Sequence, residues 1–371
     1  MHGRLQPVPP GSAPHNRYTT LDGLRGVAAL IVVWFHMALR HWAPLPAFGY
    51  LAVDMFFLLS GFVLALANDA RFAQGLSARE FLIKRVVRLY PVYLIGYALG
   101  AAALLVSMPH GSWAHFPVRA LVANAFLLPY PGQHLKLAPL FVMDGPAWSL
   151  CLEFYVANLV YALAWRSLRG ARLVLLVALS VALLAWAQQH YVNLSGGAGF
   201  DTWPEGLARV MASFFGGVLL ARVYKLHKPR FAAPSWLILV CMAVLLMAPI
   251  TGVAARAYEL LCVLVAFPSL IYFGASGRAR RPWLGTRLGD ASYVLYVIHV
   301  PILYFIALAL AHAHIRPNAA IAVTAAAALT ILACGVDRLF DAPVRRWLTW
   351  RFAGRRTKIK PVQGVQLTLV G

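Results

Sequence analysis

The chain has 371 residues, of which 61% are hydrophobic and only 12% are charged, and its mean hydropathy is +0.70. Soluble globular domains carry about a quarter charged residues, so this composition excludes an ordinary soluble domain and indicates an integral membrane protein. The formal net charge of +21 does not indicate nucleic-acid binding, because the basic residues form short clusters between apolar runs, as is typical of membrane topology.

Residues 1–20 contain Pro7, Pro9, Pro10 and Pro14 and lack an apolar core, so we interpret them as a cytoplasmic tail and not as a cleaved signal peptide. The four cysteines lie within apolar segments and lack the spacing of metal ligands. We therefore expect neither a disulfide framework nor a metal site.

Ten apolar segments follow, each close to the length of about 20 residues that a membrane-spanning helix needs. They are residues 21–41, 48–67, 89–107, 147–165, 172–190, 207–224, 235–253, 257–275, 291–311 and 317–336. The sequence thus predicts an all-α integral membrane protein, a bundle of about ten transmembrane helices within 21–336, with a basic cytoplasmic tail at 337–371. Between the third and fourth segments, the apolar patch "LVANAFLLPYPG" leaves an interfacial and a re-entrant position both open.

The distribution of basic residues tests this count. If the N-terminus lies inside, 27 of the 33 lysines and arginines fall on the inner side and six on the outer side. This asymmetry fits the positive-inside rule, and a missed or extra span would destroy it. We therefore expect an even number of helices with both termini in the cytoplasm.

The first apolar segment carries Asp22, Arg25 and His36. A charge within a span costs about 2.5–3.5 kcal/mol and usually faces the bundle interior, where it serves a function. Arg25 and His36 are eleven residues apart, which at ~100° per residue places them on one helix face roughly 16 Å apart. The alternatives without function are an interfacial ion pair for Asp22 with Arg25 and an interhelical hydrogen bond for His36.

Two later segments also carry polar residues at depth. In the fourth, Glu153 lies below the outer surface with Ser149 one turn away and Tyr155 nearby, and we expect Arg209 of the sixth segment to be its counter-ion. The ninth contains a group in "ASYVLYVIHVP" made up of Tyr293, Tyr296 and His299. For the tyrosines interfacial anchoring is the alternative to a functional role, and for the histidine a hydrogen bond between helices.

The stretch "KRVVRLYP" places Arg85 and Arg88 three residues apart on one helix face, with Lys84 beside them. One interpretation is a further cluster that sets topology. The other is a phosphate clamp, since guanidinium groups bind phosphates through two hydrogen bonds at once.

Read together, these segments resemble the membrane acyltransferases called acyltransferase family 3. "LDGLRGVAALIVVWFH" is similar to the opening signature of that family, and "VDMFFLLSGFVL" to its second-span signature. "KRVVRLYPVY" carries its Arg-x-x-Arg, "WSLCLEFY" its Trp-Ser-Leu-x-x-Glu, and "ASYVLYVIHVP" its Ser-Tyr-x-Leu-Tyr-x-x-His-x-Pro pattern. "FDAPVRRWL" resembles the closing segment, in which Asp341 replaces the usual glutamate.

The resemblance implies a ten-helix enzyme that takes an acyl group, usually acetyl, from cytoplasmic acyl-CoA to a hydroxyl of a glycan across or within the membrane. Some relatives carry an extra extracytoplasmic hydrolase-like domain, which we expect to be absent here. A bacterial inner membrane protein that decorates exopolysaccharide or lipopolysaccharide, or its lipid-linked precursor, is the expected setting.

Such a transfer needs a base or nucleophile and stabilisation of an oxyanion. We predict that His36 acts as the base or forms an acetyl-imidazole, with Glu153 and Arg25 as further catalytic residues. The predicted contacts to the phosphates of the donor acetyl-CoA are Arg85, Arg88, Arg25 and Lys84. The predicted substrate contacts are Asp22, Ser149, Tyr155, Arg209, Tyr293, Tyr296 and His299.

Two other classes of function stay open. A multi-span glycan transporter or flippase also fits polar residues inside a ten-helix bundle, although the two halves show no clear inverted repeat. A membrane sensor or scaffold is the second, and the ordered motifs argue against it. The expected partners are acyl-CoA, a glycan or lipid-linked glycan and the lipid bilayer, without nucleic acid; the oligomeric state stays open.

Overall fold

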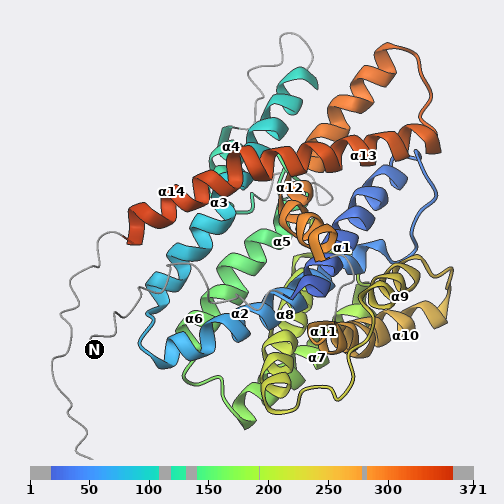
Figure 1. Ribbon diagram of the computed structural model, residues 1–371. Coiled ribbons are helices and arrows are strands. Elements are labelled where there is room, and N and C mark those ends of the chain that lie inside the picture. Colours follow the sequence, from blue (N-terminus) through green and yellow to red (C-terminus); the bar gives the residue numbers. More distant parts are fainter. Residues whose placement is uncertain (1–17, 108–117, 131–139, 192, 278–281, 354–371) are drawn as a thin grey trace, which may run out of the picture.

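The computed structural model describes residues 18–107, 118–130, 140–191, 193–277 and 282–353, and these ranges contain helices and no β-strand (Figure 1). The first half of the chain forms α1 (Thr19–Ala38), the 3₁₀ turn η1 (Gly49–Leu51), α2 (Ala52–Ala73), α3 (Ala78–Ser107), α4 (Val118–Ala125), α5 (Ala147–Cys151), the π-helix η3 (Leu152–Asn158), α6 (Leu159–Ala164) and α7 (Ala171–Tyr191). The second half forms α8 (Trp203–Leu226), α9 (Ser235–Met247), α10 (Val253–Leu261), the π-helix η4 (Cys262–Ala266), α11 (Phe267–Ala275), α12 (Pro282–His312), α13 (Ala319–Val336), the π-helix η5 (Asp337–Asp341) and α14 (Ala342–Ala353).

In these ranges, nine continuous helical stretches are long and apolar enough to cross a membrane, which confirms an all-helical protein with many spans. The segment expected at 235–253 contains α9, which has 13 residues. At 1.5 Å per residue α9 is about 20 Å long, short of a hydrocarbon core of about 30 Å. The tenth span, and the location of both termini in the cytoplasm, therefore remain predictions.

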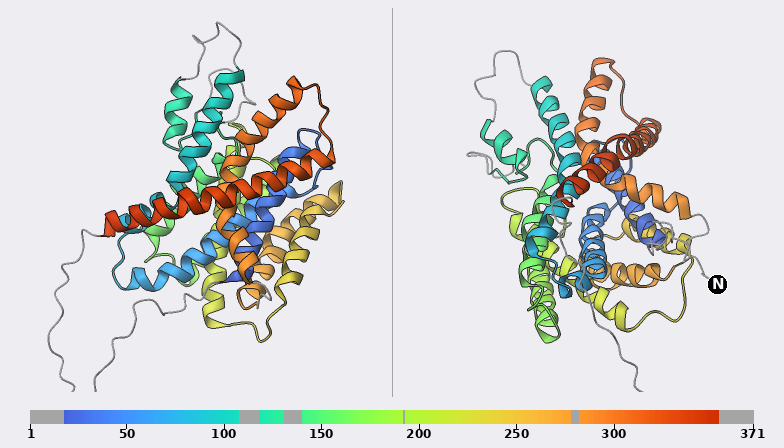
Figure 2. Two further views of the ribbon diagram at one scale, coloured as in Figure 1. Left: turned by 45° about the horizontal axis from the view of Figure 1, so that its top comes forward. Right: turned by 60° about the vertical axis from the view of Figure 1, so that its left-hand side comes forward.

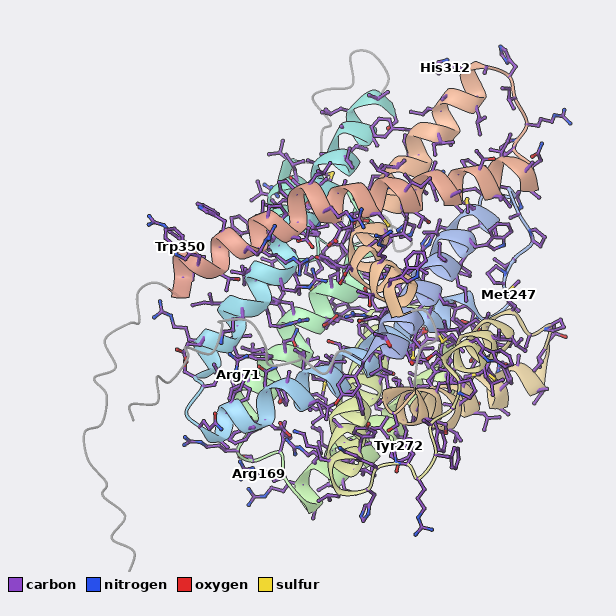
Figure 3. The ribbon with its side chains drawn as sticks, viewed as in Figure 1. Arg71, Arg169, Met247, Tyr272, His312 and Trp350 are labelled. Atoms are coloured by element: carbon purple, nitrogen blue, oxygen red, sulfur yellow. The ribbon has the colours of Figure 1, made fainter. Side chains whose placement is uncertain are left out.

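Residues predicted for opposite sides of the membrane lie at opposite ends of the bundle. Figure 3 shows Arg71 and Arg169 at one end and Met247 and His312 at the other. Alternating spans require such a separation of the helix ends, while the number of crossings and the side that faces the cytoplasm remain predictions.

Two helix pairs form the centre of the bundle, and glycines let each pair approach closely. In the α2–α8 pair, a Cβ at Gly61 would collide with the backbone of Phe214, and one at Gly217 with the backbone carbonyl of Leu58. In the α1–α12 pair, a Cβ at Gly289 would press on Asp22. Membrane helices pack through such small residues because lipid provides no hydrophobic drive between them.

Helix α3 holds the short helix α4 through three tyrosines on one face. The hydroxyls of Tyr90, Tyr93 and Tyr97 donate to backbone carbonyls of Ala125, Asn124 and Leu121 respectively, the last at 2.9 Å. The first part of the apolar patch at 121–132 is therefore a helix packed on α3. The rest of that patch from 131 lies outside the described residues.

Two predicted boundaries differ from the structure. Helix α3 begins at Ala78, well before the expected residue 89, so Arg85 and Arg88 lie on the same continuous helix as the apolar segment. Helix α13 continues through η5 into α14, so the expected tail starts as a helix, which crosses α3 (Figure 2). The sequence predicts a tail there because arginines interrupt the apolar run. Residues 354–371 of that tail lie outside the described part.

We expect Gly61→Ala to lower the midpoint of thermal unfolding, because its Cβ meets backbone that cannot rotate away. Overpacking of this kind costs about 1–3 kcal/mol. Gly216→Ala is the matched control on the partner helix, since its Cβ would lie 3.5 Å from Leu58 Cδ1, an ordinary contact. Thermal unfolding of the detergent-solubilised variants measures the effect, and equal midpoints for the two would contradict this account of the α2–α8 pair.

Candidate functional site

An internal cavity of about 150 Å³ lies between α1, α2, α3, α5, η3 and α12. Seven residues that the sequence predicts for the site line it: Arg25, Arg85, Arg88, Ser149, Glu153, Tyr293 and Tyr296. They come from four of the motifs, which are separated by long stretches of chain. The structure thus brings most of the predicted site together around one space.

Glu153 lies in the π-helical turn η3 and binds two neighbouring helices. Its Oε1 accepts a hydrogen bond of 2.6 Å from Ser60 Oγ and forms a 2.7 Å ion pair with Arg85 Nη2. The positive-inside pattern predicts Arg85 at the inner end of its span and Glu153 below the outer surface, but this contact puts both side chains at one level of the bundle. Short π-helical turns frequently mark functional sites.

Arg209 is not the counter-ion of Glu153, so that prediction is wrong. Its guanidinium pairs with Asp54, with 2.7 Å between Nη2 and Oδ2, and also donates to the carbonyls of Gly196 and Tyr50 at 2.6 and 3.0 Å. Both charged side chains are fully buried. Because each guanidinium nitrogen already has a protein partner, Arg209 holds the N-terminal part of α8 against α2, away from the cavity lining.

Arg88 is fixed by a carboxylate and an aromatic ring. Its Nη1 donates to Asp341 Oδ2 at 3.0 Å, and its guanidinium carbon lies 5.2 Å from the centre of the Tyr293 ring. Tyr293 in turn donates from its hydroxyl to the carbonyl of Leu89 at 2.6 Å. The predicted pair of Asp22 and Arg25 forms on α1.

Two of the arginines that line the cavity each have a hydrogen-bond donor without a partner. The Nε atoms of Arg25 and Arg85 are buried, and neither has a hydrogen-bond partner. A buried donor without a partner costs about 1–3 kcal/mol, and a guanidinium is well suited to phosphate or carbonyl oxygens. The cavity is therefore electrostatically suited to an oxygen-rich anionic ligand.

His36 and His299 form a hydrogen-bonded pair between α1 and α12. His299 Nδ1 lies 2.7 Å from the carbonyl oxygen of Tyr296, which can only accept, so Nδ1 carries the proton. The neutral ring then has a lone pair on Nε2, which lies 3.2 Å from His36 Nδ1. His36 Nδ1 also lies 2.9 Å from the carbonyl of Val32 and therefore is the donor. The proton positions assigned from these partners leave the lone pair of His36 on Nε2.

Tyr296 connects this histidine pair to the cavity. Its ring lines the cavity, and its ring centre is 6.0 Å from that of His299. Its hydroxyl lies 2.6 Å from Ser149 Oγ and donates to the carbonyl of Pro146 at 3.2 Å. The two histidines thus lie directly behind one wall of the cavity without lining it.

Three predicted site residues lie elsewhere. Tyr155 is part exposed and donates to the carbonyl of Phe126 at 2.8 Å, away from the cavity. Lys84 lines a separate groove, and Asp22 contacts Arg25 without lining the cavity. Their predicted roles in binding remain predictions. Among the residues that the structure describes, no cluster of three or more His, Cys, Asp or Glu side chains is suited to a metal ion.

One buried acidic residue near the site was not predicted from the sequence. Asp144 is 2% exposed, precedes α5, and has no hydrogen-bond partner for either carboxylate oxygen. Burial raises the pKa of this carboxyl well above its usual range. Its position two residues before Pro146, just ahead of the "WSL" motif, was the only signal in the sequence, and nothing there distinguishes it from a loop residue.

Comparisons with known proteins identify the family of the chain. A family profile described as an acyltransferase domain, Acyl_transf_3, matches residues 18–336. "Protein 2 in picA locus" of Rhizobium radiobacter is 38% identical over 194 residues, which are 47% of this chain and 98% of that protein. No solved structure matches the chain significantly.

Two further relatives match over smaller shares of their own length. A Komagataeibacter xylinus protein provisionally named membrane-bound transacylase BcsY is 29% identical over 52% of this chain and 54% of its own. A Bacillus subtilis (strain 168) protein provisionally named peptidoglycan O-acetyltransferase YrhL is 38% identical over 21% of this chain and 12% of its own. With the family profile covering most of the chain, the protein belongs to acyltransferase family 3 and is a multi-span membrane O-acyltransferase.

Proposed function

We propose that the protein moves an acetyl group from cytoplasmic acetyl-CoA to a hydroxyl of a cell-surface glycan or its lipid-linked precursor. The observation that carries this proposal is the His36–His299 pair next to a cavity lined by three arginines. An imidazole with a free lone pair is a base or nucleophile at neutral pH. The arginines supply the complementary charge for an anionic donor.

In the transfer, His36 Nε2 takes the proton of the acceptor hydroxyl while the hydroxyl oxygen attacks the thioester carbonyl carbon. The carbon–sulfur bond breaks, and the proton passes from His36 to the leaving CoA thiolate. His299 accepts the Nδ1 proton of His36 in a hydrogen bond and thus presents Nε2 toward the substrate. In a two-step variant, His36 Nε2 attacks the thioester carbonyl carbon and the carbon–sulfur bond breaks, which releases CoA thiolate and leaves an acetyl-imidazole. The acceptor oxygen then attacks the acetyl carbon, the nitrogen–carbon bond breaks, and the hydroxyl proton passes to the thiolate.

The cavity supports a short acyl group and an acyl-CoA donor. Its volume of about 150 Å³ equals that of an engineered cavity that holds one benzene molecule, which suits a group as small as acetyl. The unpartnered Nε atoms of Arg25 and Arg85 would bind phosphate or amide oxygens of the donor. Glu153 keeps Arg85 in place and is therefore a positioning residue in this scheme.

The topology of the proposal follows from the charge distribution. A bacterial inner membrane protein of ten spans, with both termini in the cytoplasm, would have the arginine-rich ends of α3 and α14 on the side where acyl-CoA is made. His36 would then lie toward the outer half of α1, where an acceptor from outside can approach.

We expect His36→Ala to reduce acetyl transfer about 10²–10⁴-fold, since it removes the proposed base or nucleophile. His299→Phe should lower kcat less strongly, with a smaller effect on the KM of either substrate, because it removes only the group that orients His36. Purified variants with radiolabelled acetyl-CoA and a glycan extract provide the measurement, as acetyl ester formed per minute.

His312→Ala is the control, since it removes an exposed histidine at the far end of α12. Retained transfer in His36→Ala, at a level similar to the control, would refute the role of His36. Movement of glycan across vesicles without ester formation in the unaltered protein would instead support a transporter.

The donor contacts are tested separately by affinity. Arg25→Gln removes a charged donor from the cavity, and Arg85→Lys keeps the charge beside Glu153 but lacks the Nε group. Hydrogen bonds to charged groups are worth about 1.5–3 kcal/mol, so we expect acetyl-CoA affinity to fall about tenfold or more in Arg25→Gln and less in Arg85→Lys.

Equilibrium binding of acetyl-CoA to purified protein measures both variants. The matched control is Arg79→Gln, because Arg79 is exposed on α3 and does not line the cavity. If both cavity variants bind acetyl-CoA as tightly as the control, the arginines serve packing and topology alone.

A further inference from the structure

A second, open groove lies between α3 and α14, with a volume of about 880 Å³. Five basic side chains line it together with Thr349 and Trp350, namely Lys84, Arg88, Arg338, Arg345 and Arg346. No acidic side chain is among its lining residues in the described part of the chain. It is thus much larger than the internal cavity and strongly positive.

Carboxylates neutralise only part of this charge. Asp341 pairs with both Arg88 and Arg345, at 3.0 and 2.9 Å, and Arg345 also contacts Asp337 at 3.3 Å. The ion pairs of the described residues supply no carboxylate to the remaining three cations, Lys84, Arg338 and Arg346. Arg346 Nε donates to the backbone carbonyl of Ala342 at 3.3 Å. An anionic ligand therefore meets three cations whose charge none of these ion pairs neutralises.

Arg88 joins the groove to the internal cavity, because its side chain lines both. Arg88 lies one helical turn from Lys84 in the groove and from Arg85 in the cavity, so it connects the positive charge of the two sites. A ligand that lies across Arg88 can place one end in the open groove and extend the other toward Tyr296 and the histidine pair.

We propose that this groove binds the phosphorylated adenosine end of the acyl-CoA donor, with Lys84, Arg338 and Arg346 on its phosphates and Trp350 against its adenine ring. The inference rests on the proposed function, and it adds a nucleotide subsite on α14 to the cavity that receives the acyl end. Trp350 is 69% exposed at the groove, so its ring is available for stacking. Figure 3 shows it near the end of α14.

The same three cations could hold the phosphate of an anionic lipid headgroup, because the chemistry of the phosphate is shared. The ring of Trp350 distinguishes a nucleotide from a lipid headgroup. Adenine stacks on a tryptophan face, and such stacking contributes to affinity independently of charge. A lipid headgroup has no such ring, so its retention would depend on the cations alone.

The test uses the full-length protein in nanodiscs of phosphatidylcholine, with adenosine 3′,5′-bisphosphate and acetyl-CoA as probes. The groove variants are Lys84→Gln/Arg346→Gln and Trp350→Ala. Arg351→Gln and Trp347→Ala are matched controls, because both residues lie on α14 and neither lines the groove. Each control removes the same chemical group from the same helix.

We expect the double charge variant to bind both probes about tenfold more weakly or worse, and Trp350→Ala at least about fivefold more weakly, with both controls unchanged. Transfer from acetyl-pantetheine, which lacks the nucleotide, should stay the same in all variants. Unchanged affinity for both probes in both groove variants would overturn the subsite while leaving the proposed function intact.

A second arm replaces part of the phosphatidylcholine by phosphatidylglycerol. If the charge variant loses bound phosphatidylglycerol but keeps its affinity for the nucleotide probes, the groove is a lipid site and the proposal is wrong. If the unaltered protein binds neither acetyl-CoA nor the bisphosphate, the proposed function fails together with the subsite, an outcome distinct from failure of the groove variants alone.

Discussion

An ionised carboxylate within a bundle of spanning helices is costly unless a cation pairs with it. Glu153 forms such a pair with Arg85 at the centre of the site. Ser60 contributes a second contact to the same oxygen, so one carboxylate joins α2, α3 and η3 around the cavity. The Nε atom of Arg85 is buried and has no hydrogen-bond partner. The ion pair that stabilises the packing therefore also orients the group that we propose for donor binding.

The histidine pair depends on packing of a different kind. The small residues Gly26 and Gly289 at the α1–α12 contact let the two backbones approach closely, and this approach brings the rings of His36 and His299 within hydrogen-bond distance. Backbone carbonyls of α12 then determine that Nδ1 of His299 carries the proton. The chemistry of His36 is thus determined by helix geometry, and the hydrogen bonds of the pair within the described part of the chain involve no carboxylate.

The sequence predicts which residues gather at the site better than it predicts their partners. Polar residues at depth in apolar segments and their resemblance to family motifs identified His36, Glu153 and the α3 arginines. The partners depend on which helices are neighbours, which periodicity does not reveal. Arg209 has the right charge and expected depth for Glu153, yet α8 packs on α2 and places it on Asp54. The sequence likewise does not predict that α13 continues into α14, because the arginines there resemble a positively charged cytoplasmic tail.

The closing segment "FDAPVRRWL" shows how one residue connects the parts of the site. Asp341 lies in the π-helical turn η5, where it is fully buried, and its Oδ2 contacts Arg88 of α3 and Arg345 of α14. Because a buried carboxylate with two guanidinium partners resists separation from either, Asp341 holds α14 across α3. That crossing creates the basic groove and sets Arg88 between the groove and the cavity. Asp341, although it does not contact the histidines, therefore determines how the basic side chains are arranged between the groove and the cavity beside them.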